Sequence, residues 1–311
     1  YSNARAKRDA NPHAAAMKHL HNILVKRVLL LGAAAWSRLS GGRHAGSAAR
    51  GSDGRRLTRG PSGVYVLDLA CGRANDLNHW RQMGATRVVG IDSCQAVVAE
   101  ARERVSQRPT HSHKRPRVEE CADVRIECGD AANERVLDAI DPPRFDVVSC
   151  NMAIQYFFDS EARAMALLGV ARKRLARRGG AFVGVFPNGD AVMDTLRRNR
   201  GLLEMPALKL ERRTDNNMNA YVFEIADTVV DGGSDNLEYA VSPEQLTRMA
   251  RAQGLRPIQD RVLWRDLEAV TTSDWLSPGI KGIVPPRNHY EETAVKLGYE
   301  RASRLYAIFA F

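Results

Sequence analysis

The sequence predicts an α/β fold: a mostly parallel central sheet with helices on both faces and an antiparallel edge formed by the C-terminal part of the chain. Between residues 64 and 186, short apolar runs of strand length alternate with helical patterns. Strands that alternate with helices are joined by right-handed crossovers and become parallel neighbours in one sheet. The chain has 311 residues, 44% of them hydrophobic, which is enough to bury the core of one enlarged domain of this class.

The first element is an amphipathic helix over residues 14–31, because apolar side chains recur on one stripe. These are Met17, Leu20, Leu24, Val28 and Leu31. We then expect, in chain order, strand 64–70, helix 75–83, strand 87–91, helix 94–106, strands 124–128 and 145–150, helix 161–176 and strand 181–186. Strand 220–225, helix 243–253 and strands 257–263 and 305–311 follow, and these late strands are expected to extend the sheet with its antiparallel edge.

Two segments have the composition of flexible basic loops. Residues 37–63 are rich in Gly, Ser and Arg with few apolar side chains, and residues 107–117 have a similar character. Such segments bury too little apolar surface to offset the entropy of ordering them. The formal net charge of +10 favours an anionic partner such as RNA. A membrane surface is disfavoured, because the loop arginines have no accompanying apolar face and no apolar run is long enough to span a bilayer.

The cysteines exclude some classes of site. There are five, without a C-x-x-C pair, which argues against a disulfide framework and against a zinc site. We therefore expect no metal.

A ligand site is expected where the first three core strands end. The strand that begins at Val64 ends in a turn of small residues with a single glycine, Gly72, and so lacks the G-x-G-x-x-G pattern of dinucleotide sites. Asp68 suits a cationic ligand group better than a pyrophosphate. Asp92 can accept both hydroxyls of a ribose, and Asp130 can accept from an adenine amino group. Each aspartate alone could equally cap a helix. Together they look like the S-adenosylmethionine site of class I methyltransferases.

Features outside that core resemble the mRNA cap guanine-N7 methyltransferases, over nearly the whole chain apart from the two basic segments. The matching pieces are His21-Asn-Ile-Leu-Val-Lys26, Leu67-Asp-Leu-Ala-Cys-Gly72 with Asp76-Leu77 and Trp80, Phe145-Asp-Val-Val-Ser-Cys150 running into Tyr156, Phe186-Pro-Asn188, Tyr221-Val-Phe223, Leu237-Glu-Tyr239 and Leu305-Tyr-Ala-Ile-Phe-Ala-Phe311. The resemblance implies methyl transfer from S-adenosylmethionine to N7 of the guanosine that caps the 5′ end of mRNA.

The resemblance also implies roles for individual residues. To the cofactor it assigns Lys26, Gly72, Asp92 and Asp130, with Asn151 where glutamine is usual, and Asp68 is added from its place in the strand end. To the cap it assigns Asn22, Tyr156, Pro187, Phe223, Glu238 and Tyr306. Glu238 could accept from the guanine imino and amino groups, a donor pair that adenine lacks. No acid, base or nucleophile is assigned, because N7 already carries a free lone pair and transfer needs only alignment.

Each role has an alternative. Tyr156 and Phe223 could be ordinary core aromatics, Lys26 could lie on a solvated helix face, and Pro187 with Asn188 could only start a turn. Glu238 lies among apolar residues, where an unpaired carboxylate is costly, so a ligand or a buried cation is expected beside it.

The sequence departs from the family pattern at three places. Gln155 stands where the family has histidine, and it can hydrogen-bond the guanine edge but cannot carry a charge. Arg73-Ala74-Asn75 replaces Lys-Gly-Gly, so the positive charge near cofactor or phosphate is kept while its two neighbours are bulkier. Asn151 is one methylene shorter than the usual glutamine.

These observations lead to one expected domain over residues 1–311: an N-terminal helical segment (1–36), the basic loop (37–63), the cofactor-binding core (64–186) and a part that forms the cap pocket and completes the sheet (187–311). The expected partners are the capped RNA 5′ end and an RNA triphosphatase and guanylyltransferase, in trans or as upstream domains. We expect a monomer in the nucleus, or in the cytoplasm if the protein is viral. Two other functions stay open: methylation of another RNA or small-molecule acceptor, and cap binding without catalysis.

Overall fold

The computed structural model describes residues 11–40, 63–106, 123–138, 140, 144–213, 219–227, 237–272 and 276–311. It begins with a continuous helical segment made of α2 (Pro12–Lys18), the π-helix η1 (His19–Lys26) and α3 (Arg27–Leu39). The helix predicted at 14–31 is confirmed, but it ends later, inside the segment expected to be a basic loop. The rest of that segment, residues 41–62, and the insert at 107–117 lie outside the described residues.

The main sheet has eight strands in the order β10-β11-β12-β5-β4-β1-β2-β3. Its parallel part consists of β1 (Val64–Leu69), β2 (Ala85–Asp92), β3 (Asp123–Cys128), β4 (Val147–Ser149) and β5 (Ala181–Pro187). Its antiparallel edge consists of β12 (Tyr306–Ala310), β11 (Ile280–Ile283) and β10 (Thr271–Thr272). The predicted α/β class and the antiparallel C-terminal edge are both confirmed.

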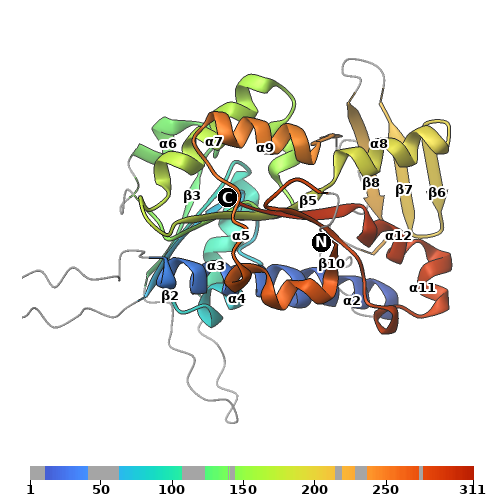
Figure 1. Cartoon of the computed structure of the whole chain (residues 1–311), viewed down its shortest axis with the longest axis horizontal. Coiled ribbons are helices and arrows are strands. Elements are labelled where there is room, and N and C mark those ends of the chain that lie inside the picture. The colour runs from blue at the N-terminus through green and yellow to red at the C-terminus, as the bar shows by residue number, and fades with distance from the viewer. Residues whose placement is uncertain are drawn as a thin grey trace, which may run out of the picture.

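Helices cover both faces of this sheet (Figure 1). One face carries α3, α4 (Leu77–Gln82), α5 (Gln95–Ser106) and α10 (Arg261–Trp264). The other carries α6 (Glu134–Asp138), α7 (Glu161–Arg174) and α9 (Pro243–Ala252). Two separate hydrophobic cores correspond to these faces: Leu29 and Trp80 belong to the first, and Leu167 and Leu246 to the second. The side chains of the central strands β1, β4, β5 and β12 alternate between the two cores, as their near-continuous apolar runs require.

A second, four-stranded antiparallel sheet stands beside the main one. It contains β6 (Leu202–Met205), β7 (Leu208–Arg212), β8 (Ala220–Ile225) and β9 (Leu237–Tyr239), and α8 (Gly189–Arg198) packs on it. The strand predicted at 220–225 is confirmed, but the expectation that it extends the main sheet is wrong. Its hydrogen-bonding edges are already filled by β7 and β9.

The prediction of a strand at 257–263 is also wrong. Pro257 has no N–H to donate to a sheet, and the Asp260 side chain accepts from Val262 N at 2.8 Å. Asp260 thereby caps α10, which starts at Arg261. The chain passes from an extended stretch into a helix where a strand was expected.

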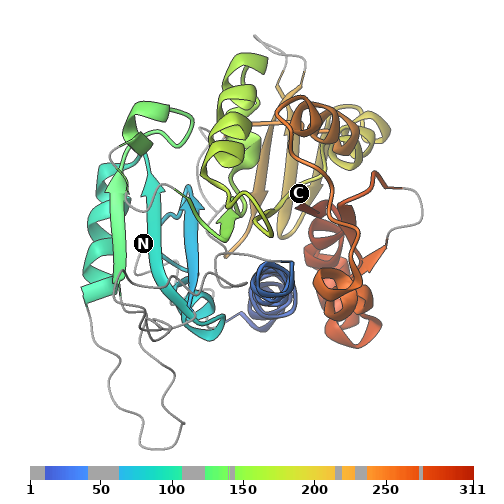
Figure 2. The same ribbon diagram turned by 60° about the vertical axis from the view of Figure 1, so that its left-hand side comes forward.

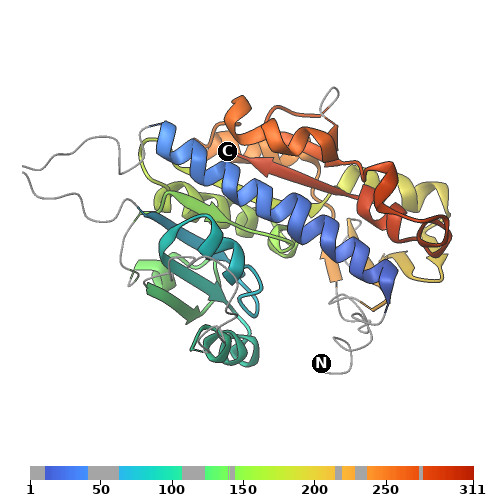
Figure 3. The ribbon, with the colours of Figure 1, turned by 90° about the horizontal axis from the view of Figure 1, so that it is seen from below.

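One of the remaining described elements, η2 (Ile154–Phe157), contacts β9, β5 and α7. The others lie towards the N-terminal helix: η3 (Arg265–Val270), η4 (Arg287–His289), α11 (Glu292–Leu297) and α12 (Tyr299–Arg304). Figure 2 shows the N-terminal helix nearly end-on, and Figure 3 shows that it runs from the main sheet to α12. None of the described helices is long and apolar enough to cross a bilayer.

The two sheets are joined at one backbone junction. Asn188, directly after β5, forms a parallel bridge with Val241, and Gly189 N donates to Val241 O at 2.8 Å. A Cβ on Gly189 would lie 2.4 Å from Val241 N, so only glycine permits this approach. The end of β5 is therefore held against the segment that follows β9.

Candidate cofactor and guanine site

The turn after β1 docks on the end of β2. Gly72 N donates to Asp92 Oδ2 at 2.9 Å, and Cys94 N donates to Asp92 Oδ1 at 3.0 Å. Ala70, Gly72 and Ala74 all have positive φ, at 63°, 55° and 53°. This left-handed conformation is costly for alanine, by roughly 1–2 kcal/mol per residue. A Cβ on Gly72 would meet no atom within 4 Å, so the turn has an open side.

Asp76 links two of the predicted cofactor residues. Lys26 Nζ lies 3.3 Å from Asp76 Oδ1, and Asn151 Nδ2 donates to Asp76 Oδ2 at 3.2 Å. His79 Nδ1 lies 3.3 Å from the same carboxylate. Burial alone would raise the pKa of Asp76, but Lys26 and His79 hold that pKa below its usual value. Asp76 was not predicted as a site residue, although it lies in the Asp76-Leu77 motif.

Asp68 is a buried residue near the C-terminal end of β1. Its carboxylate accepts from Ser149 Oγ at 2.8 Å, because Asp68 and Ser149 are directly opposite in the β1–β4 ladder. Burial and the nearby negative charge of Asp76 raise the pKa of Asp68 to about 8. A positively charged ligand group beside Asp68 would stabilise the ionised form of this carboxyl group.

Asp130 follows β3 and has partners on both oxygens. Oδ1 accepts from Ala132 N at 3.0 Å, and Oδ2 lies 3.3 Å from Arg163 Nη2. The Arg163 guanidinium lies over the Phe157 ring, 5.2 Å from its centroid. Arg163 is a second residue near the site that was not predicted from the sequence.

Glu238 lies in β9, directly opposite Tyr221 of β8, and is 3% exposed. Its Oε1 accepts from Tyr156 Oη at 3.1 Å and from Gln155 Nε2 at 3.3 Å. Its Oε2 is buried with no hydrogen-bond partner. Burial raises the pKa of Glu238, and the nearby hydroxyl of Tyr221 and the bonds from Gln155 and Tyr156 oppose that rise. Within the described part of the chain, no lysine, arginine or histidine forms an ion pair with Glu238, so the buried cation that was one of its expected partners is not found there.

Aromatic rings lie near this carboxylate. The centroids of Phe223 and Tyr306 are 5.7 Å apart with their planes 32° apart. Pro187 is opposite Tyr306 in the β5–β12 ladder. The His21 ring packs edge-on against Tyr306, with the ring centroids 4.8 Å apart, a contact that was not predicted from the sequence. Asn22, half-buried in η1, is the next residue after His21.

One short segment connects the two groups of residues. Asn151 contacts Asp76, and four positions later Gln155 contacts Glu238. Gln155 Nε2 also donates to the backbone oxygen of Met152 at 3.2 Å. Asp92 and Glu238 thus belong to one continuous set of contacts that runs through the turn after β1. The Arg73 side chain pairs with α5 instead: its Nε lies 3.1 Å from Glu100 Oε2.

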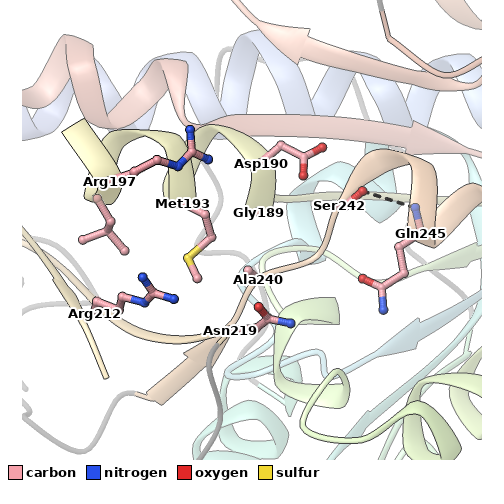
Figure 4. Close-up of a pocket in the computed structure, with 10 residues that line it drawn as sticks. Gly189, Asp190, Met193, Arg197, Arg212, Asn219, Ala240, Ser242 and Gln245 are labelled. Carbon is pink, nitrogen blue, oxygen red and sulfur yellow. Dashed lines mark hydrogen bonds between the residues drawn. The ribbon is translucent and has the colours of Figure 1, made fainter. Parts of the chain in front are cut away.

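A separate cavity of about 320 Å³ lies next to this site, beyond the junction of Asn188 with Val241. Figure 4 shows the Met193 side chain of α8 reaching towards Arg212 of β7 across it. Gln245 N donates to Ser242 Oγ at 3.3 Å on its other side. None of the predicted site residues lines this cavity.

Comparison with known proteins identifies relatives of this chain. The family model of the mRNA (guanine-N(7))-methyltransferase domain matches residues 56–311. The mRNA cap guanine-N(7) methyltransferase of Cryptococcus neoformans is 26% identical over 262 residues, which are 79% of this chain and 40% of that protein. The mRNA cap guanine-N(7) methyltransferase 1 of Arabidopsis thaliana is 37% identical over 141 residues, 44% of this chain and 36% of that protein.

A solved S-adenosylmethionine-dependent methyltransferase from Clostridium acetobutylicum is similar over 79% of this chain and 82% of that chain, with 15% sequence identity and a TM-score of 0.45. The curated relatives are longer proteins, and this chain matches 40% or less of the length of the two named above. The matched domain nevertheless covers most of the 311 residues, and the chain therefore belongs to the mRNA (guanine-N(7))-methyltransferase family.

Proposed function

We propose that this chain transfers a methyl group to N7 of the guanosine that caps the 5′ end of mRNA, with S-adenosylmethionine as the donor. The observation that carries the proposal is Glu238 Oε2, which is buried and accepts no hydrogen bond from the described residues, with only the Tyr221 hydroxyl nearby. An unpaired buried carboxylate oxygen costs roughly 1–3 kcal/mol or more, so a ligand that donates to it is strongly favoured. Guanine supplies the imino and amino donors that this oxygen requires, and adenine does not.

The described residues at the strand ends also fit the cofactor. Asp68 is suited to the amino group, Asp92 to the ribose hydroxyls and Asp130 to the adenine amino group. Gly72 leaves an open side, and the buried Asn151 Oδ1 lacks a partner. When bound, S-adenosylmethionine supplies an electrophilic methyl group on its sulfonium.

The protein side of the reaction is alignment. Guanine N7 needs no deprotonation, so Glu238 has to hold the base edge while the rings of Phe223 and Tyr306 exclude water from its faces. Burial and the neighbouring Glu238 carboxylate raise the pKa of Tyr156, which keeps its hydroxyl protonated as a donor. A misaligned base would lose rate even if it stayed bound.

The wider context belongs to the same proposal. The substrate partner is the capped RNA 5′ end, and an RNA triphosphatase and a guanylyltransferase act before this step, in trans or as upstream domains. We propose a monomeric catalytic domain that acts in the nucleus, or in the cytoplasm if the protein is viral.

The test uses the purified chain, radiolabelled S-adenosylmethionine and the dinucleotide GpppA. We expect transfer to N7, identified by comparison with an m7GpppA standard. In Glu238→Ala the rate of cap methylation should fall by about 100-fold or more, because the guanine imino and amino donors lose their acceptor. The affinity for S-adenosylhomocysteine should change little. Asp92→Ala should weaken S-adenosylhomocysteine binding instead.

Three results would reject the proposal. Methylation of another position or of uncapped RNA alone would identify a different acceptor. Cap binding without transfer would identify a binding module, a function made conceivable by Gln155 and the Arg73–Asn75 turn. Equal loss of cofactor affinity in both variants would contradict the division into two pockets.

A further inference from the structure

Six arginines lie on α7, on α9 and on the residues that directly follow these two helices. All six are exposed, and none forms an ion pair with any residue in the described part of the chain. They are Arg172, Arg177, Arg178, Arg248, Arg251 and Arg256, and are called the arginine surface below. Most other arginines and lysines near these helices are paired: Lys173 with Glu134, Arg174 with Asp138 and Arg163 with Asp130.

The six side chains belong to one surface because the ends of the two helices touch. A Cβ on Gly254, after α9, would lie 3.5 Å from Arg172 Nε of α7. A Cβ on Gly169 would lie 3.3 Å from Gln253 Oε1. The acidic residues of both helices, Glu161 and Glu244, lie in their first turns, at the opposite ends. Positive charge is thus concentrated where α7 and α9 end.

Both helices begin beside the guanine pocket. α7 follows η2, which carries Gln155 and Tyr156, and α9 starts four residues after the end of β9, which carries Glu238. At about 1.5 Å per residue, these helices carry the arginine surface some ~15–20 Å away from the pocket. A free cap cannot reach that far, but the RNA chain attached to it can.

We propose that the arginine surface binds phosphates of the RNA chain downstream of the cap. This inference rests on the proposed function. An RNA chain is favoured over an acidic protein or a membrane, because none of the large hydrophobic side chains exposed in the described residues lies on α7 or α9. Stable protein interfaces and membrane-binding faces contain such side chains, whereas phosphate contacts need only cations.

The experiment compares two substrates, GpppA and a capped 20-nucleotide RNA. The variant carries Arg172→Gln, Arg248→Gln, Arg251→Gln and Arg256→Gln. A matched control removes four exposed charges elsewhere, by Arg135→Gln, Arg198→Gln, Arg265→Gln and Arg301→Gln. Thermal melting of both variants is measured to check that they are folded.

The variant should raise KM for the long RNA about tenfold and leave KM for GpppA unchanged, and the control should change neither. The log-log salt dependence of long-RNA binding should become shallower by about 0.7 for each phosphate that the variant no longer neutralises. In a series of capped RNAs of increasing length, the variant should differ from the wild type only beyond a threshold length.

Three outcomes would overturn the inference: equal KM changes for both substrates, an unchanged salt slope, or binding of polyglutamate in place of RNA. Binding of a labelled, uncapped 20-nucleotide RNA tests the surface without the reaction. If GpppA is not methylated by any form of the chain, the proposed function fails, while the loss or retention of this RNA binding still decides the inference.

Discussion

The amide of Gln155 donates to the carboxylate of Glu238 at 3.3 Å, although 83 positions separate these residues in the sequence. Gln155 and Tyr156 both donate to Oε1, which leaves Oε2 for a ligand. Replacement of Gln155 should therefore change guanine affinity without changing cofactor affinity.

Gln155→Leu removes one donor to a buried carboxylate. We expect KM for GpppA to rise roughly ten- to 150-fold, because a hydrogen bond to a charged group is worth about 1.5–3 kcal/mol. Gln155→His, which introduces the family residue, should keep the bond and stay within about threefold of the wild type. Kinetics with GpppA and calorimetry with S-adenosylhomocysteine measure both. A Leu variant with weakened cofactor binding alone would refute this assignment.

Asp68 gives the site a pH dependence of defined sign. In the ligand-free chain the pKa of Asp68 is raised from its usual 3.8 to about 8. If the cofactor amino group binds beside it, binding favours the ionised form. S-adenosylhomocysteine affinity should then rise as the pH increases towards about 8, and Asp68→Asn should bind more weakly and flatten this rise.

The same shift affects folding. Between about pH 4 and pH 8 the unfolded chain has lost the proton that folded Asp68 still holds, so this group makes the free energy of unfolding fall as the pH rises through that window. Denaturant unfolding at pH 5, 6.5 and 8 should show a smaller decline in Asp68→Asn. An identical decline in both proteins would show that Asp68 is not the group responsible.

Arg163 should act on adenine recognition through Asp130. Arg163→Met keeps a long apolar side chain over Phe157 but removes the donor to Asp130 Oδ2. Because Arg163 is partly exposed, we expect a modest effect: S-adenosylhomocysteine should bind roughly three- to tenfold more weakly. S-inosylhomocysteine, which lacks the adenine amino group, should be affected much less.

Arg163→Lys is the matched control, since it preserves the charge and should recover part of the selectivity. A uniform loss for both ligands would show that Arg163 only supports the local fold.

Gly189 should be essential for the junction of the two sheets. Gly189→Ala forces a Cβ against Val241 N, so we expect destabilisation of about 1–3 kcal/mol. At this chain length each kcal/mol lowers the melting temperature by roughly 2–4 °C. Gly169→Ala, in the middle of α7 beside a flexible glutamine side chain, should be neutral or slightly stabilising. Equal melting temperatures for the two variants would contradict the role of the junction.

The sequence was most informative where strands are buried on both faces. The strands that begin at Val64, Ala85 and Ala181 are nearly continuous apolar runs that end in recognisable turns, and all were predicted. β6 and β7 are short and partly exposed, so their pattern resembles that of a loop. α8 was missed because Pro187-Asn188 reads as a turn, although Asn188 caps this helix.

The site contacts that were missed depend on the tertiary fold. Lys26 meets Asp76 across 50 positions, and Arg163 meets Asp130 across 33. No local pattern indicates such pairs. The roles of the individual cofactor and cap residues remain predictions, which the variants above address.

The π-helix η1 imposes a fixed spacing on both pockets. His21 packs on Tyr306 and Lys26 pairs with Asp76, five positions apart, and burial together with the nearby charge of Lys26 lowers the pKa of His21 to about 3. In a regular α-helix, residues five apart point about 140° away from each other, whereas the wider turn of a π-helix brings them towards one side. If the same residues wound as an α-helix, Lys26 would rotate away from its carboxylate. The wider winding of η1 thus keeps the Lys26–Asp76 pair and the His21–Tyr306 contact in register.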